Sequence, residues 1–136
     1  MSLAKRILPA LPRLRRFGQM LMASSTEVDH VIQSCLQEII DNPESLSETD
    51  DTDAALFKMF LERANSTAGL VTNKPGSGLM ELVYEFLSDL SFVERQTFLL
   101  RFVEGFGRKQ TAKIMGLRKK EVMKLEKRLI RKLPFD

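Results

Sequence analysis

The sequence has 136 residues, of which 43% are hydrophobic, and this proportion suits a folded protein rather than a disordered one. It contains no run of 18 apolar residues and no signal-peptide pattern, so we expect no transmembrane helix, no membrane partner and a cytoplasmic location. The single cysteine, Cys35, excludes an internal disulfide.

The net charge of +3 conceals a strong asymmetry along the chain. Residues 1–20 carry five basic and no acidic groups, and residues 21–100 carry four basic and fourteen acidic groups. Residues 101–136 carry twelve basic and four acidic groups. This pattern predicts two lobes that bind different partners or attract each other, although plain solvated surface explains the acidic stretch equally well.

Apolar residues recur at helical spacing and alternating β-branched runs are absent, which predicts an all-α protein. The first predicted helix runs from Pro12 to about Ala23. The second runs over residues 28–40, where apolar residues follow i, i+3, i+4, i+7 spacing, and it ends at Asn42 and Pro43.

An acidic loop is predicted over residues 44–53, and a third helix follows it. One face of that helix is apolar and consists of Leu56, Phe57, Phe60, Leu61 and Ala64. Residues 65–78 have the composition of turns and linkers. We therefore expect two small helical lobes, 1–65 and 79–136, joined by a linker over 66–78.

The second lobe opens with apolar residues at helical spacing, namely Leu79, Leu82, Val83, Phe86 and Leu87. Ser91 and Glu94 have the spacing of a capping box, which predicts that the next helix begins there. That helix is expected to stop at Gly105.

Residues 108–131 have the spacing of a helix-turn-helix. Small Ala112 stands where two helices would cross, and Gly116 follows four residues later at the turn. The second helix is expected from about Arg118 to Lys132, with Arg118 at a capping position where Ser or Thr is more favourable. A plain helical hairpin in a bundle is the alternative.

The outer face of this last helix is strongly basic, which is typical of a helix that enters a DNA groove. The candidate DNA-binding residues are Arg118, Lys119, Lys120, Lys124, Lys127, Arg128 and Arg131. Met123 lies among them, where a base-reading residue would more often be polar, and exposed methionine favours adaptable protein contact.

No catalytic constellation is visible, so we expect neither an enzyme nor a bound cofactor or metal. His30 is the only histidine and is interpreted as a surface residue, since a general base needs a partner within reach. One His and one Cys cannot by themselves form a metal site.

The stretch from Leu87 to Leu133 resembles region four of extracytoplasmic-function sigma factors. Glu94-Arg95-Gln96 matches the start of that family's "ER" helix, and Glu104-Gly105 matches its "EG" turn. The first lobe resembles region two, on the stretches Leu14-Arg15-Arg16-Phe17 and Asp29-His30-Val31-Ile32-Gln33.

Over nearly its whole length the chain is still more similar to the sigma-factor-like domain of the PhyR family of general-stress response regulators. The similar stretches are MSLAKRILPALPRLRRF, VDHVIQSCLQEIIDNP and ALFKMFLERANS. This resemblance implies a sigma-factor mimic, exposed by phosphorylation of a C-terminal receiver domain, that binds the anti-sigma factor NepR and so releases the stress sigma factor. It also implies that a receiver domain is a partner if this chain is a fragment.

The candidate partner-binding residues are apolar side chains of the first lobe and a mixed group on the last helix. They are Phe57, Phe60 and Leu61, together with Met123, Lys119, Lys120, Lys124 and Lys127. The alternative for the apolar residues among them is that they belong to the core. The alternative function is a genuine extracytoplasmic-function sigma factor that binds core RNA polymerase and promoter DNA and is inhibited by NepR.

Overall fold

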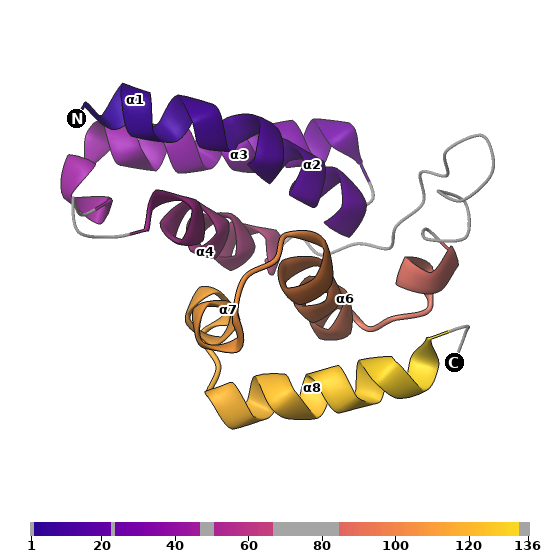
Figure 1. Ribbon diagram of the computed structural model, residues 1–136. Helices are drawn as coiled ribbons and strands as arrows, with labels where there is room; N and C mark the ends of the chain where they lie inside the picture. Colours follow the sequence, from indigo (N-terminus) through magenta and orange to yellow (C-terminus); the bar gives the residue numbers. More distant parts are fainter. Residues whose placement is uncertain (1, 23, 47–50, 67–84, 134–136) are drawn as a thin grey trace.

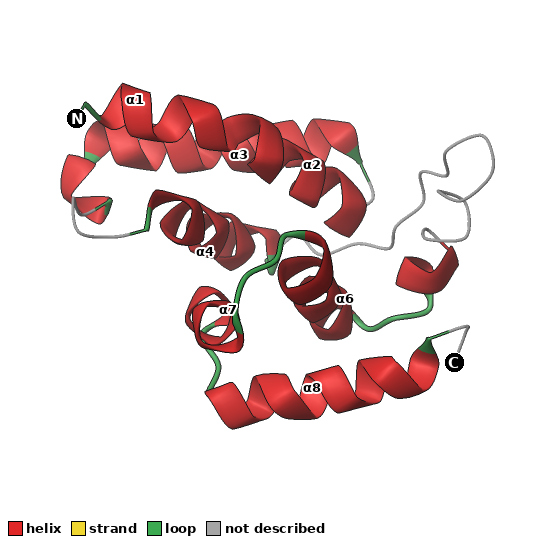
Figure 2. Cartoon of the chain, viewed as in Figure 1, coloured by secondary structure: helices red, strands yellow, loops and turns green. Residues whose placement is uncertain are grey.

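The computed structural model describes residues 2–22, 24–46, 51–66 and 85–133, and all regular structure within these ranges is helical (Figure 2). This confirms the all-α prediction. The predicted helix that opens the second lobe falls partly outside the described residues, as does nearly all of the predicted linker. None of the described helices has the length and apolar character needed to cross a membrane.

Where the structure describes the first lobe, it contains four α-helices and two short 3₁₀ turns. Figure 1 shows how they are arranged. They are α1 Leu3–Ile7, η1 Leu8–Ala10, α2 Leu11–Leu21, α3 Ser25–Asp41, η2 Pro43–Ser45 and α4 Thr52–Ala64. Helical structure therefore starts earlier than predicted. Pro9 and Pro12 permit this because each lies in the first turn of its element, where a backbone N–H has no intrahelical acceptor.

Side-chain oxygens that accept backbone N–H hydrogen bonds cap the starts of the longer helices. Ser24 accepts a hydrogen bond from the Glu27 N–H at the start of α3. Asp51 accepts from the N–H groups of Asp53 and Ala54 at the start of α4, so the acidic loop ends two residues earlier than predicted.

The second lobe contains α6 Phe92–Phe98, a wider π-helical turn η3 Leu99–Val103, α7 Arg108–Met115 and α8 Lys119–Lys132. The Ser91 hydroxyl accepts from the Glu94 N–H while the Glu94 carboxylate accepts from the Ser91 N–H, which confirms the predicted capping box. Gly105 has a φ of 78° just after η3, at the predicted stop.

The helix-turn-helix prediction is also confirmed. Gly116 follows α7 in the left-handed conformation with a φ of 70°, and its N–H donates to the Lys113 carbonyl. Ala112 of α7 is buried, and α7 packs against the second helix, which begins at Lys119 after the N-cap Arg118. Glu121 compensates for the missing capping hydroxyl, since its carboxylate accepts the Arg118 N–H at 3.0 Å.

Phe57, Phe60 and Leu61 lie in the core and are at most 1% exposed. Phe17 packs on both rings, at centroid distances of 4.8 Å to Phe57 and 6.0 Å to Phe60. The expectation that these side chains contact a partner does not fit this structure, because they are buried where α2, α3 and α7 pack against α4.

The two lobes are packed together, with α4 against α7 and α2 against α6 (Figure 1). Arg13 of α2 lies at the centre of this contact. It donates to the carboxylates of Asp53 at 2.6 Å and Glu104 at 2.7 Å, and also to the Glu104 carbonyl at 2.6 Å. The Phe106 ring lies 4.6 Å from its guanidinium carbon and 5.2 Å from the Phe57 ring. Arg13 therefore joins both lobes through charge and aromatic packing.

A buried arginine provides the second connection between the lobes. Arg95 of α6 is 2% exposed and donates to the carbonyls of Leu21 in the first lobe and of Leu87 and Leu90 in the second. Burial lowers the pKa of Arg95 below its ordinary value. Three carbonyl oxygens thus take the place of water around the guanidinium.

We predict that Arg13→Ala lowers the free energy of unfolding by about 2 kcal/mol, because it leaves the Glu104 carboxylate buried without its cation. Arg15→Ala is the matched control, since Arg15 lies one half-turn away and forms an exposed pair with Asp29. Urea denaturation followed by circular dichroism measures both. Equal losses for the two variants would contradict a bridging role for Arg13.

Candidate functional site: the last helix and the apolar groove

Helix α8 is held to its lobe by apolar residues and by a buried glutamate. Val122, Leu125 and Leu129 are at most 4% exposed and face α6 and α7. Glu126 lies between them at 5% exposure and receives hydrogen bonds from Arg101 and Arg108, the latter at 2.8 Å. Burial acts to raise the pKa of Glu126, but the two arginines outweigh it and the net pKa is lowered.

Glu94 anchors the other end of the helix. Its carboxylate receives both Lys132 hydrogen bonds, at 2.8 and 3.0 Å, and lies 3.8 Å from Arg128. Burial acts to raise the pKa of Glu94, but the hydrogen bonds from Lys132 and Ser91 act in the opposite direction. They outweigh burial, and the net pKa is lowered. The capping glutamate of α6 thereby also fixes the C-terminal turn of α8.

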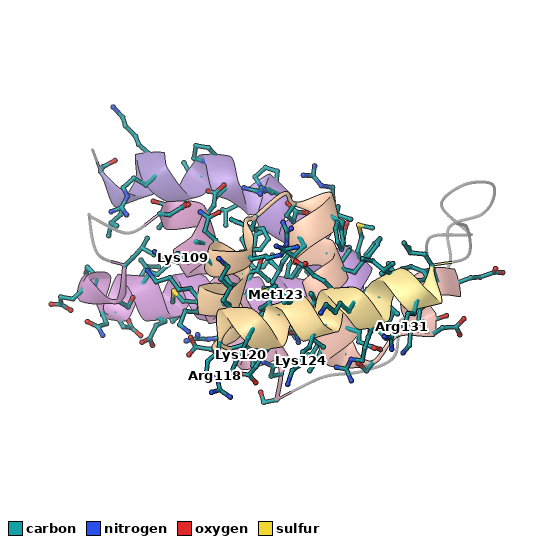
Figure 3. The ribbon with its side chains drawn as sticks, turned by 60° about the horizontal axis from the view of Figure 1, so that its bottom comes forward. Lys109, Arg118, Lys120, Met123, Lys124 and Arg131 are labelled. Carbon is teal, nitrogen blue, oxygen red and sulfur yellow. The ribbon has the colours of Figure 1, made fainter. Side chains whose placement is uncertain are left out.

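The predicted basic residues of α8 and its N-cap are all exposed. Figure 3 shows four of them, Arg118, Lys120, Lys124 and Arg131. Arg118 pairs with Glu121 and Arg128 approaches Glu94. The remaining five form no ion pair within the part of the chain that the structure describes, and they are Lys119, Lys120, Lys124, Lys127 and Arg131. We call this set the basic face.

Exposed apolar side chains flank the basic face on one side. Met123 is 38% exposed and Ile130 is 62% exposed. The structure thus places Met123 and the four predicted partner-binding lysines on one surface, while it separates them from Phe57, Phe60 and Leu61 in the core.

The sequence did not single out a second surface, an apolar groove in the first lobe. It has a volume of about 350 Å³ and is lined by Leu3, Ala4, Ile7, Leu8, Leu11, Leu36, Ile39, Ile40 and Pro43. A neighbouring hollow of about 550 Å³ shares Leu8 and Leu11 with it, so the two form one continuous surface. Leu8 is 62% and Ile40 is 70% exposed, and helical spacing alone had placed Ile40 on the inner face.

His30 and Cys35 are the only histidine and the only cysteine of the sequence. His30 is exposed, as predicted, and burial raises the pKa of the Cys35 thiol to about 11, which makes it a poor nucleophile. Among the described residues, no three His, Cys, Asp or Glu side chains converge as metal ligands would.

We predict that Glu126→Gln lowers the free energy of unfolding by about 2 kcal/mol at pH 7, because a neutral amide pairs less well with Arg101 and Arg108. The folded-state pKa is lowered, so the wild-type advantage is complete above the ordinary carboxyl pKa near 4.3 and is lost as pH falls through the lowered value. The measurement is urea denaturation of both proteins from pH 3 to 7. The control is Glu121→Gln, a more exposed position on the same helix, for which a smaller loss is expected. If wild type and Glu126→Gln differed in stability as much at pH 3 as at pH 7, the result would contradict this explanation.

Family models and individual relatives give a consistent picture. The model for the sigma2 domain of PhyR matches residues 7–61, and that for the sigma-like domain of the response regulator PhyR matches residues 87–130. The phyllosphere-induced regulator PhyR of Methylorubrum extorquens is 28% identical over 137 residues, which is 100% of this chain and 51% of that protein. The chain thus spans about half the length of this relative.

Two solved structures share the fold. The PhyR sigma-like domain in the PhyRSL–NepR complex from Sphingomonas sp. Fr1 is 26% identical with a TM-score of 0.82, over 97% of this chain and 87% of that one. The sigma factor RpoE from Bartonella quintana, solved with NepR, has a TM-score of 0.80 at 18% identity, over 94% of this chain and 91% of that one, which shows the fold alone. With both halves matched in order, the chain belongs to the PhyR family and comprises its sigma2 and sigma-like domains.

Proposed function

We propose that this chain is a sigma-factor mimic that binds a NepR-type anti-sigma factor and thereby frees a stress sigma factor for transcription. The observation that carries the proposal is the whole-length similarity to a PhyR sigma-like domain that was solved in complex with NepR. The mimic would act in the cytoplasm, where transcription takes place, and its role is regulatory rather than enzymatic. In longer family members a receiver domain would control access to it.

The charge of the first lobe supports a mimic over a working sigma factor. The segment from Glu27 to Glu62 contains ten acidic groups and one basic group, Lys58. Promoter melting needs aromatic and basic residues that stack on bases and contact phosphates, but the sequence has no Trp and one Tyr. Nucleic acid would be repelled from this segment.

The apolar groove supplies a binding site for an amphipathic helix of the anti-sigma factor. Its lining is aliphatic, and two of the lining side chains, Leu8 and Ile40, are largely exposed. Together they form an exposed apolar patch rather than scattered single residues. An amphipathic helix buries its apolar face in such a groove through residues spaced by three or four. The groove thus takes the place of Phe57, Phe60 and Leu61 as the first-lobe contact.

We expect isothermal titration calorimetry of the chain with the NepR-type anti-sigma factor of the same organism to show 1:1 binding. Ile40→Glu should weaken that binding at least tenfold, because it places a charge in the groove. Gln33→Glu on the same helix adds an equal charge outside the groove lining and should have little effect. Absence of binding in low salt would overturn the function, whereas equal affinity of wild type and Ile40→Glu would overturn only the groove.

A genuine sigma factor remains the second candidate, favoured by the exposed basic face of the helix-turn-helix. A run-off assay with core RNA polymerase and a stress promoter distinguishes the two. The mimic predicts no transcript from this chain, and a transcript would favour the sigma factor.

A further inference from the structure

The apolar groove of the first lobe continues into a charged hollow. The elements α1, η1 and α2 follow one another without a break from Leu3 to Leu21, and α3 packs alongside α2 (Figure 1). The groove and the hollow share Leu8 and Leu11, and the hollow extends along α2 as far as Gln19. At 1.5 Å per residue the surface from Leu3 to Gln19 is about 24 Å long, which matches about four turns of a bound helix.

Two arginines of α2 and one aspartate of α3 bring charge into the hollow, since Arg15, Arg16 and Asp29 all line it. The Arg15 guanidinium donates to both oxygens of the Asp29 carboxylate, at 2.9 and 3.3 Å, and this hydrogen bonding lowers the pKa of Asp29. Arg16 is exposed and forms no ion pair with any residue that the structure describes. The hollow therefore carries one uncompensated positive charge.

The other end of the groove carries the opposite charge. Ile40 and Pro43 line this end, and two exposed carboxylates, Asp41 and Glu44, stand next to them in the sequence. Neither carboxylate forms an ion pair within the described ranges. Lys5 is exposed on α1 but does not line the groove, so the rim keeps a net negative charge. The aliphatic surface thus lies between a positive hollow and a negative rim.

We propose that this polarity determines the direction in which the groove binds the amphipathic helix of its partner. One carboxylate of that helix lies against Arg16, and the opposite, basic end of the helix lies beside Asp41 and Glu44. The inference rests on the proposed function, because it describes how the same groove recognises the anti-sigma helix.

The reason lies in the difference between apolar and charged contacts. Aliphatic side chains supply affinity without selecting a direction, whereas charges at the two ends discriminate between them. A helix bound the other way would bring its carboxylate to Asp41 and Glu44, where like charges repel, and would leave Arg16 without a partner.

The test is isothermal titration calorimetry of the whole chain with the NepR-type anti-sigma factor of the same organism, at 50 and 300 mM NaCl. Arg16→Glu should weaken binding about tenfold at the lower salt concentration, because it removes an attraction and adds a repulsion, and screening should reduce this loss at 300 mM. Lys5→Glu is the matched control, since it changes the charge equally outside the groove lining. It should change the affinity by less than about threefold.

A charge-swap scan then locates the group that Arg16 contacts. Each acidic residue of the anti-sigma factor is replaced in turn by arginine, and each variant is titrated against Arg16→Glu. One replacement should restore the wild-type affinity to within about threefold. The same scan of its basic residues with glutamate, against Glu44→Arg, should give a restoring residue at the opposite end of the same helix. Circular dichroism confirms that all variants are folded.

The outcomes separate this inference from the function on which it rests. If the wild-type chain does not bind the anti-sigma factor, the proposed function fails and the inference fails with it. If the wild type binds, the inference alone is overturned by any of three results: Arg16→Glu binds as tightly as wild type, Arg16→Glu and Lys5→Glu weaken binding equally, or the scans give no restoring pair at opposite ends of one helix.

Discussion

Arg13 holds the two lobes together through one buried ion pair at the centre of their contact. It reaches Asp53 in α4 and Glu104 after η3, residues that are 40 and 91 positions away in the sequence. Because the Glu104 carboxylate is almost completely buried, separating the lobes would leave it without its cation unless water entered the contact. The Phe57 and Phe106 rings, which meet edge to face, close the same contact with apolar area. Both candidate surfaces lie outside this contact and are therefore presented in a fixed relation to each other.

Local features of the fold could be predicted from the sequence because both partners lie within a few residues. The Ser91–Glu94 capping box and the Gly116 turn are of this kind. The burial of Phe57, Phe60 and Leu61 could not be predicted, since an apolar stripe on a helix has the same sequence pattern whether it faces a core or a partner. Their burial depends on packing partners such as Phe17 and Phe106, which both contact Phe57 and lie at least 40 residues from it in sequence. The pairing of Glu126 with Arg101 and Arg108 likewise depends on how α8 lies across its lobe.

The distribution of charge gives the two lobes different roles. In the first lobe the groove is lined by aliphatic side chains, which favours a protein helix as its ligand. In the second, buried glutamates hold the last helix so that its cations point outward. A shape shared with sigma factors can therefore carry different binding functions, because affinity depends on the side chains that the shared helices expose.

Competition for the anti-sigma factor is the central claim of this account. Its most direct test is to titrate the chain into a preformed complex of the NepR-type anti-sigma factor with its fluorescently labelled stress sigma factor, and to follow the labelled protein by size-exclusion chromatography. We expect the sigma factor to elute alone while the chain and the anti-sigma factor elute together in a 1:1 complex. A ternary complex, or a sigma factor that stays bound at excess chain, would contradict the account.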